Sequence, residues 1–193
     1  MRMPEADAVA VAQARAGNAD AFRTLVDRHS RNLFRLAYRI TGSEHDAEDV
    51  VQETFLRAYR RLHEFEERAN VGTWLYRIAS NCAVDLLRSR PRWMTHAASP
   101  DPEGYMPETQ DDAPAADRLV MSAEIERTIQ ETMNELSPTE RAAFVLRHFE
   151  GMSIEEAGSA LGLGASATKH SIFRAVKKMR RALAPFTTAP ASH

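Results

Sequence analysis

The sequence predicts an all-α protein made of two small helical domains joined by a flexible acidic linker. Apolar residues recur three and four positions apart on both sides of the middle of the chain, as they do on one face of a helix. Between these stretches, residues 92–120 are rich in proline and acid and show little periodicity, which is typical of a linker. We expect helical domains at 18–91 and 121–184, with an N-terminal tail at 1–17 and a C-terminal tail at 185–193.

The first domain opens with two amphipathic helices. Asn18 is a suitable N-cap, and the apolar face that starts at Phe22 ends at Gly42, a residue type that commonly terminates helices. His29 lies on this apolar face, and because no metal ligands stand at a suitable spacing around it, we interpret it as a packed histidine at the edge of the core. Ser43 then caps the second helix.

The second helix carries acids in its first turns and arginines in its last, an order that the helix dipole favours at both ends. Helix stability alone is sufficient to explain this pattern. The outward face also offers a graded acidic-to-basic surface that suits a basic partner helix, and the residues by themselves leave both interpretations open. This surface comprises Asp46, Asp49, Gln52, Glu53 and Arg57.

A polar loop from His63 to Gly72 precedes a third helix, expected at 73–88. Aromatic, amide and arginine groups beside such a loop can stack on bases, read base edges and hold phosphates, which is the chemistry of single-stranded DNA capture. Trp74 taken alone is more typical of a core anchor than of a platform for bases.

The C-terminal domain has the pattern of a helix-turn-helix. Ser137 and Ser153 each open a helix and are each followed three residues later by glutamate, which makes two capping boxes. Pro138, at the first helical position, strengthens the first of these starts. A turn with two glycines at 161–164 allows the next two helices to cross at a steep angle.

The last helix of this domain is basic on one side. From Lys169 to Arg181 it holds six basic residues and no acidic one, which suits a helix whose start enters the major groove of DNA while its flank meets phosphates. A solvated basic helix end, favoured by its own dipole, is the alternative interpretation. The capping boxes, the glycine turn and the charge asymmetry together favour duplex DNA as a partner.

Composition and motif content limit where the protein is expected to act and which classes of function it can have. No apolar run is long enough for a membrane span and the N-terminus lacks the pattern of a signal peptide, so we expect a soluble, cytoplasmic protein. Cys82 is the single cysteine and is expected to be buried. No phosphate loop, metal-ligand spacing or catalytic nucleophile is evident, so we expect no enzyme, cofactor or metal site. The net charge of −2 predicts weak DNA affinity for the chain alone.

Three motifs follow one another along the chain: DAEDVVQETF at 46–55, WLYRIASN at 74–81 and LSPTER at 136–141, ahead of the helix-turn-helix. With them the chain resembles the extracytoplasmic-function group of bacterial sigma factors. The resemblance implies a region 2 domain, a linker and a region 4 domain that direct RNA polymerase core to promoters, DNA melting and transcription initiation. It further implies the β′ clamp coiled coil, the β flap, promoter DNA and an anti-sigma factor as partners, without membrane insertion.

The same resemblance implies roles for three sets of residues. Core polymerase would bind the outward surface from Asp46 to Arg57 that is described above. The unpaired minus-ten bases would be captured by Phe65, Asn70, Arg77, Asn81 and Arg88. The minus-35 major groove and its phosphates would be contacted by Lys169, His170, Phe173, Arg174, Lys177 and Lys178.

The recognition helix departs from the family pattern. Members usually present serine and then arginine where this chain has His170 and Ser171, and Gly164 and Thr168 replace the commoner serine and valine. A serine hydroxyl cannot make the bidentate guanine contact of arginine, which is worth roughly 1–3 kcal/mol of discrimination. We therefore expect an altered minus-35 preference. The alternative function is a conventional dimeric helix-turn-helix regulator that binds palindromic DNA without polymerase.

Overall fold

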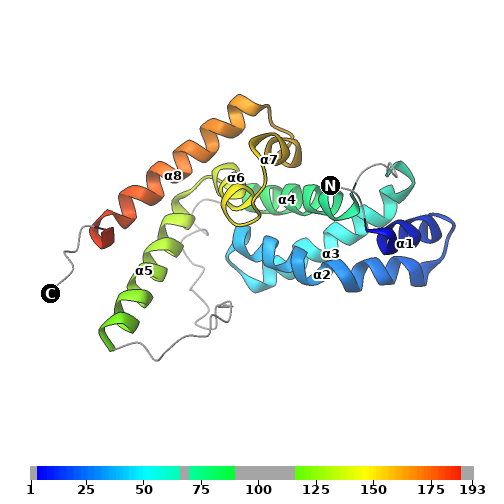
Figure 1. The fold of residues 1–193 in the computed structure, drawn as a ribbon, viewed down its shortest axis with the longest axis horizontal. Helices are drawn as coiled ribbons and strands as arrows, with labels where there is room; N and C mark the ends of the chain where they lie inside the picture. The colour runs from blue at the N-terminus through cyan, green and yellow to red at the C-terminus, as the bar shows by residue number, and fades with distance from the viewer. Residues whose placement is uncertain (1–3, 66–69, 90–115, 188–193) are drawn as a thin grey trace.

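The computed structural model describes residues 4–65, 70–89 and 116–187. An N-terminal unit contains α1 (Glu5–Arg15), α2 (Ala19–Thr41), α3 (Glu44–Arg61), a short 3-10 turn (Leu62–Glu64) and α4 (Val71–Ser89). A C-terminal unit contains α5 (Ala116–Glu135), α6 (Pro138–His148), α7 (Ile154–Leu161) and α8 (Ala165–Thr187) (Figure 1). The all-α prediction is confirmed for these residues, and none of the helices among them is both long and apolar enough to cross a membrane.

The residues expected to form the N-terminal tail contain the helix α1. It packs on α2, with Val11 only 1% exposed. The buried carboxylate of Asp7 lies 3.1 Å from Arg28 Nη1 and 3.1 Å from His29 Nε2, so it ties α1 to the middle of α2. His29 therefore lies at the core edge with a carboxylate partner. Helix α1 has little signal in the sequence, because its start lacks a side-chain cap and two of its four buried residues are alanines.

The helix boundaries follow the capping chemistry expected from the sequence. The Asn18 side chain accepts hydrogen bonds from the backbone N–H groups of Asp20 and Ala21, and the Ser43 hydroxyl accepts one from Asp46. Gly42 ends α2 in the left-handed conformation, with φ of 75°. Both predicted capping boxes are present, at the starts of α6 and α7.

The end of the predicted linker is also helical, because α5 begins at Ala116 rather than at 121. The rest of that linker, 92–115, lies outside the described residues, as do residues 90 and 91 at the end of the predicted first domain. In the predicted turn, Gly162 takes a left-handed φ of 65°, whereas Gly164 does not need a positive φ. The steep crossing of α7 and α8 therefore depends on one of the two glycines for its backbone conformation.

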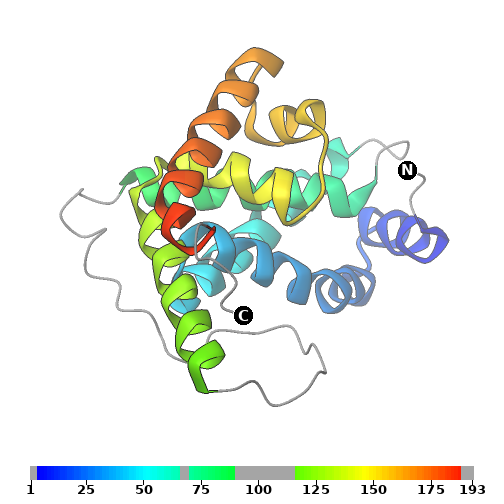
Figure 2. The ribbon, with the colours of Figure 1, turned by 60° about the vertical axis from the view of Figure 1, so that its left-hand side comes forward.

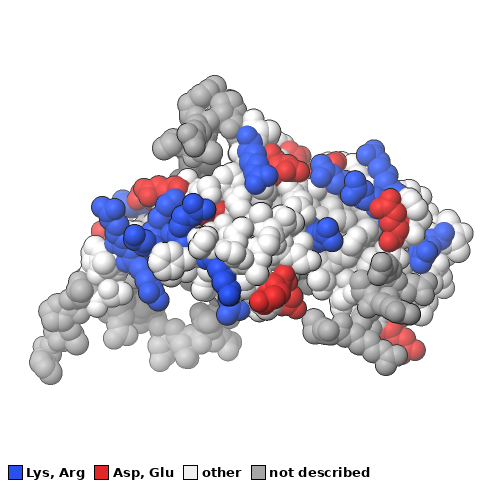
Figure 3. Space-filling model, turned by 90° about the horizontal axis from the view of Figure 1, so that it is seen from above, with Lys and Arg blue, Asp and Glu red and all other residues white. Residues whose placement is uncertain are grey.

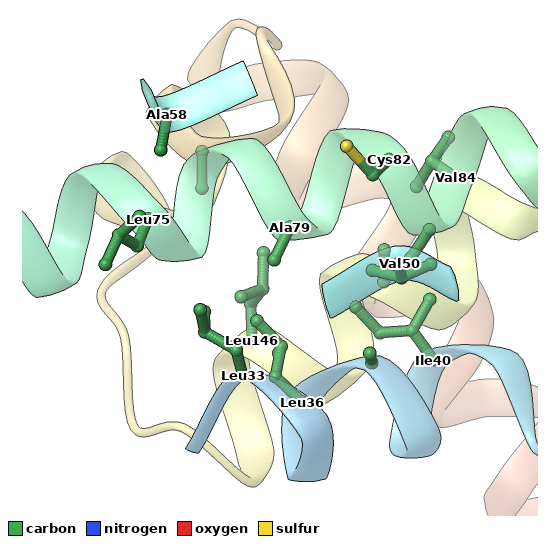
Figure 4. Close-up of a cluster of buried hydrophobic side chains, with 14 of the residues drawn as sticks. Leu33, Leu36, Ile40, Val50, Ala58, Leu75, Ala79, Cys82, Val84 and Leu146 are labelled. Carbon is green, nitrogen blue, oxygen red and sulfur yellow. The ribbon is translucent and has the colours of Figure 1, made fainter. Parts of the chain in front are cut away.

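The two units pack directly on each other. Helices α6 and α7 lie against α2 and α4, as both views of the ribbon show (Figures 1 and 2). The buried apolar side chains form one cluster that runs through both units, and Figure 4 shows Leu146 of α6 among Leu33 and Leu36 of α2 and Ala79 of α4. Cys82 is buried in the same cluster, as expected. The core is thus continuous across the boundary that the sequence predicted between two domains.

Candidate functional site

An open apolar groove of about 810 Å³ runs between α2 and α3. Two large apolar side chains of α3 stand exposed along it, Leu56 at 46% and Tyr59 at 57%. Phe22 of α2 supports Tyr59 edge to face, with ring centroids 5.0 Å apart. Polar groups from Glu48 and Gln52 border the groove. An exposed apolar strip of this kind, with a polar rim, is typical of a surface that binds another protein.

The residues expected to contact polymerase divide into three kinds. Asp49 and Gln52 are exposed on α3, and Gln52 lines the groove. Arg57 pairs with Glu53 at 2.6 Å and lies 3.9 Å from Asp85, so this pair faces the α4 side of the helix. Asp46 is only 1% exposed, which corrects the expectation that it points outward.

Phe65 and Asn70, two of the residues expected to capture minus-ten bases, stabilise the fold beside the loop that joins α3 to α4. Phe65 is 3% exposed and packs against Trp74, with ring centroids 5.0 Å apart, so its ring lies in the core in this conformation. The side chain of Asn70 accepts a hydrogen bond from the backbone of Thr73 at 3.2 Å and thereby caps α4. These two residues fix the ends of the loop whose middle, 66–69, lies outside the described residues.

The other three residues of that set lie on α4, on the side that meets the C-terminal unit. Arg77 is exposed. Asn81 donates from Nδ2 to its own helix, at Arg77 O (2.8 Å), and to α7, at Ala160 O (3.0 Å). Arg88 donates from Nη2 to Thr139 Oγ1 of α6 at 2.9 Å. Two of the three side chains are thus engaged by the other unit.

The outward side of α8 is basic with an apolar centre. Phe173 is 67% exposed, and Lys169, His170 and Lys177 are exposed around it. Seen from above, Lys and Arg side chains gather over the part of the molecule where α8 lies (Figure 3). A hollow of about 540 Å³ beside Phe173 is lined by Lys169, Lys177 and further basic residues. Its lining comprises Arg147, His148, Ile154, Lys169, Ile172, Phe173, Val176, Lys177 and Arg180.

Two cations of α8 are held by one buried carboxylate. Glu140, only 5% exposed, lies 3.0 Å from Arg174 Nε and 2.9 Å from Lys178 Nζ. Burial alone would raise the pKa of this carboxyl, but the hydrogen bonds from Lys178 and from the Ser137 backbone outweigh it, and the pKa is lowered. Arg174 and Lys178 are therefore partly neutralised where they lie. The capping-box pattern revealed Glu140 as a cap and gave no sign of this second role.

Ser171, expected at the DNA-reading surface, lies on the inner side of α8. It is 4% exposed and its hydroxyl donates to Ala167 O at 3.0 Å. Ser171, which stands where family members usually have arginine, therefore lies inside the helix-turn-helix rather than on its outer surface. His170 is the exposed residue at this departure from the family pattern.

Comparison with known proteins identifies the chain. The family model described as sigma-70 region 2 matches residues 25–92, and the one described as sigma-70 region 4 matches residues 126–179. The ECF RNA polymerase sigma factor SigW of Bacillus subtilis is 32% identical over 176 residues, which cover 90% of this chain and 94% of that protein. The chain belongs to the ECF group of RNA polymerase sigma factors. The sigma-H factor of Pseudomonas aeruginosa is 32% identical, covering 96% of this chain and 97% of that one.

Solved structures agree with this family. CnrH, solved in complex with the cytosolic domain of CnrY, aligns with a TM-score of 0.63 and 31% identity over 94% of this chain and 99% of that one. Helices α2 to α4 of this sigma factor thus form region 2, and α5 to α8 form region 4. The protein is a sigma factor that directs transcription initiation, and a dimeric regulator that works without polymerase is not favoured.

The change Glu140→Gln is expected to destabilise region 4 in a pH-dependent way. The amide can still accept from Ser137, so the cap remains, while the ion pairs with Arg174 and Lys178 are lost at a cost of about 1–3 kcal/mol. Because the folded pKa of Glu140 is lowered, its contribution is present above the ordinary pKa and disappears as the pH falls through the folded one. Urea unfolding of the wild type and of Glu140→Gln, each at about pH 7 and about pH 3, measures the difference in their free energy of unfolding at the two pH values. We expect the difference to be smaller at the lower pH.

The matched control is Glu156→Gln in the other capping box. Glu156 accepts from the Ser153 backbone at 2.8 Å in the same way, but it is fully exposed and no cation is paired with it in the described residues. A loss of stability for Glu140→Gln no larger than that for Glu156→Gln would show that the ion pairs contribute nothing beyond the cap.

Proposed function

We propose that the groove between α2 and α3 is where this sigma factor docks on the β′ clamp coiled coil of RNA polymerase core. The observation that carries the proposal is the open apolar groove with Leu56 and Tyr59 exposed along it. A helix with an apolar stripe fits such a groove, and Asp49 and Gln52 beside it suit basic or polar groups on that helix. Asp46 supports α3 from within and makes no part of this contact.

Charge reversal by Asp49→Arg is expected to weaken binding to purified core polymerase roughly tenfold, or about 1.4 kcal/mol, because a rim acid becomes a like charge for a basic partner. Titration of labelled protein with core measures the affinity, and circular dichroism checks that folding is intact. The control is Glu126→Arg, the same change at an exposed position of α5. Equal affinities for the two variants would remove Asp49 from the proposed surface.

Two further surfaces are proposed to bind promoter DNA. Lys169, His170, Phe173 and Lys177 on the outer side of α8 would contact the minus-35 major groove and its phosphates. Arg174 and Lys178, which Glu140 holds by ion pairs, would contact the same DNA beside them. On α4, the surface with Arg77, Asn81 and Arg88 would hold unpaired minus-ten bases, while Phe65 and Asn70 would position the loop.

We further infer that the protein acts in the cytoplasm, has no catalytic activity of its own and is controlled by an anti-sigma factor. The complex of the related CnrH with the cytosolic domain of CnrY supports a protein partner of this kind. Transcription from a promoter library by purified core, with and without this protein, tests the function as a whole. Initiation at no promoter, together with no binding to core, would exclude it.

A further inference from the structure

Helix α1 lies at the end of region 2 where α3 finishes and α4 begins (Figures 1 and 2). The sigma-70 region 2 model matches residues 25–92, so α1 precedes the matched part of the chain. The buried side chains of α1 nevertheless belong to the same apolar cluster as Leu62, Phe65 and Val71, which stand on either side of the segment that joins α3 to α4. The helix is therefore packed beside the place where minus-ten bases are proposed to be captured.

The last residue of α1 reaches the turn that follows α3. Arg15 donates from Nη2 to the backbone oxygen of His63 at 3.4 Å. His63 is the middle residue of the 3-10 turn, and Phe65 follows that turn directly. Carbonyl groups at the end of a helix lack partners within the helix, so a donor from a neighbouring element can set the direction in which the chain leaves. Helix α1 thus holds the turn from which Phe65 extends.

A buried carboxylate near the start of α1 reaches the other side of the same segment through α2. Asp7 is 5% exposed and lies 3.1 Å from Arg28 Nη1 and 3.1 Å from His29 Nε2. Because a carboxylate only accepts hydrogen bonds, the His29 ring donates from Nε2. Hydrogen bonds to a charged group are stronger and shorter than neutral ones. The carboxylate of α1 therefore sets the orientation of the imidazole.

The His29 ring in turn packs on the first turn of α4. A Cβ added at Gly72 would lie 3.6 Å from His29 Cε1 and 3.1 Å from Asn70 Oδ1, so the imidazole and the amide lie on the same side of Gly72. That Oδ1 atom accepts from the Thr73 backbone at 3.2 Å and caps α4. Asn70 is thus placed next to a ring that α1 orients.

We propose that α1 is a brace for minus-ten capture, in which Arg15 positions Phe65 and Asp7 positions Asn70. The proposal rests on the strand-binding role proposed above for Phe65 and Asn70. The brace acts by keeping both residues preorganised, so that less ordering is required when bases are captured. Loss of the brace should weaken capture of the unpaired strand, whereas core binding through the groove between α2 and α3 and minus-35 binding through α8 should persist.

The first experiment measures base capture by the holoenzyme. The DNA is a fork junction, with a duplex minus-35 element and an unpaired minus-ten strand, from a promoter selected in the library transcription. The reference DNA carries abasic sites in place of the minus-ten bases, so the ratio of the two affinities reports capture alone.

We expect Asp7→Ala to lower this ratio roughly threefold or more, and Arg15→Ala roughly twofold, as for lost hydrogen bonds. The matched controls are Glu5→Ala, in the same first turn of α1, and Arg23→Ala, on α2, both at exposed positions. Thermal unfolding and titration with core check that each variant is folded. Ratios for Asp7→Ala and Arg15→Ala equal to those of their controls would overturn the proposal.

The second experiment separates positioning from a general loss of structure. In an Asn70→Ala background, Asp7→Ala should lower the ratio no further, because the group that Asp7 positions is already absent. Asp7→Asn, which keeps one acceptor for His29, should retain part of the capture that Asp7→Ala loses. Fully additive losses for Asp7→Ala and Asn70→Ala would overturn the proposed route through Asn70.

A direct contact between Arg15 and DNA is the other explanation to test. Removal of a phosphate contact lowers the slope of log affinity against log salt concentration by about one, whereas loss of a positioning contact leaves that slope unchanged. A reduced slope for Arg15→Ala would overturn its role in the brace.

The two hypotheses fail in different ways. If wild-type holoenzyme bound the fork junction no more tightly than the abasic reference, the proposed strand-binding role of α4 would fall, and the brace with it. If wild type captured the bases and the α1 variants did so equally well, the proposed function would stand and the brace alone would be excluded.

Discussion

Replacement of Gly158 by alanine is expected to force α7 away from α8 and so to disable the helix-turn-helix of region 4. A Cβ at this position would lie 2.8 Å from Thr168 Oγ1 and 2.9 Å from the backbone oxygen of Leu163. Thr168 is fully buried and the Leu163 oxygen belongs to the turn, so neither can give way easily. Such overpacking costs roughly 1–3 kcal/mol, occasionally more. The misplaced α8 should lose minus-35 binding while core binding through region 2 persists.

Urea unfolding measures the stability of Gly158→Ala, and minus-35 duplex binding by the holoenzyme measures its function. Gly164→Ala is the matched control, because a Cβ there meets nothing within 4 Å and the backbone has no positive φ, so a loss of about 0.5 kcal/mol at most is expected. The double variant Gly158→Ala/Thr168→Ala should recover part of the loss, since it removes one of the two clashes. Normal minus-35 binding by Gly158→Ala would contradict the assigned role of this close contact.

Local chemistry made much of the fold predictable. Capping side chains at Asn18, Ser43, Ser137 and Ser153 and the turn glycine Gly162 each act on backbone groups a few residues away, so their effect is readable from neighbouring letters of the sequence. The same holds for the basic side of α8. Amphipathic periodicity located α2, α3 and α4 for the same reason.

Asp46 shows an error that helical geometry could have prevented. It lies one turn before Val50 and two turns before Thr54, both fully or almost fully buried, so the i, i+4 spacing puts all three on the inner side of α3. Its charge suggested an outward position, and the periodicity predicted the opposite. Charge at the start of a helix is thus a poor guide to exposure when the capping turn itself is packed.

Contacts between distant segments had no local signal. The pairing of Glu140 with Arg174 and Lys178 depends on α8 lying across α6, and the burial of Phe65 depends on Trp74 after a loop. The contact between the two units was hidden further by the acidic linker, whose composition suggests independent domains. A linker composition reports the freedom of the linker, and it does not report whether the units at its ends attract each other.

Truncation by Leu146→Ala is expected to cost about 2–5 kcal/mol of the free energy of unfolding, the range for a fully buried leucine whose removal leaves a cavity. Leu146 is 0% exposed among Leu33 and Leu36, so the cavity would open inside the core that both regions share (Figure 4). Thermal unfolding should shift down by roughly 5–15 °C.

The control for this change is Met121→Ala, which removes apolar atoms from a side chain that is 46% exposed on α5 and is expected to alter stability by less than about 0.5 kcal/mol. If the regions share one core, wild type should unfold in a single transition, because loss of either region exposes apolar surface of the other. Leu146→Ala should weaken this coupling and separate the melting of region 2 from that of region 4. Two independent transitions in wild type, with only the region 4 transition moved by Leu146→Ala, would show that Leu146 stabilises its own region alone.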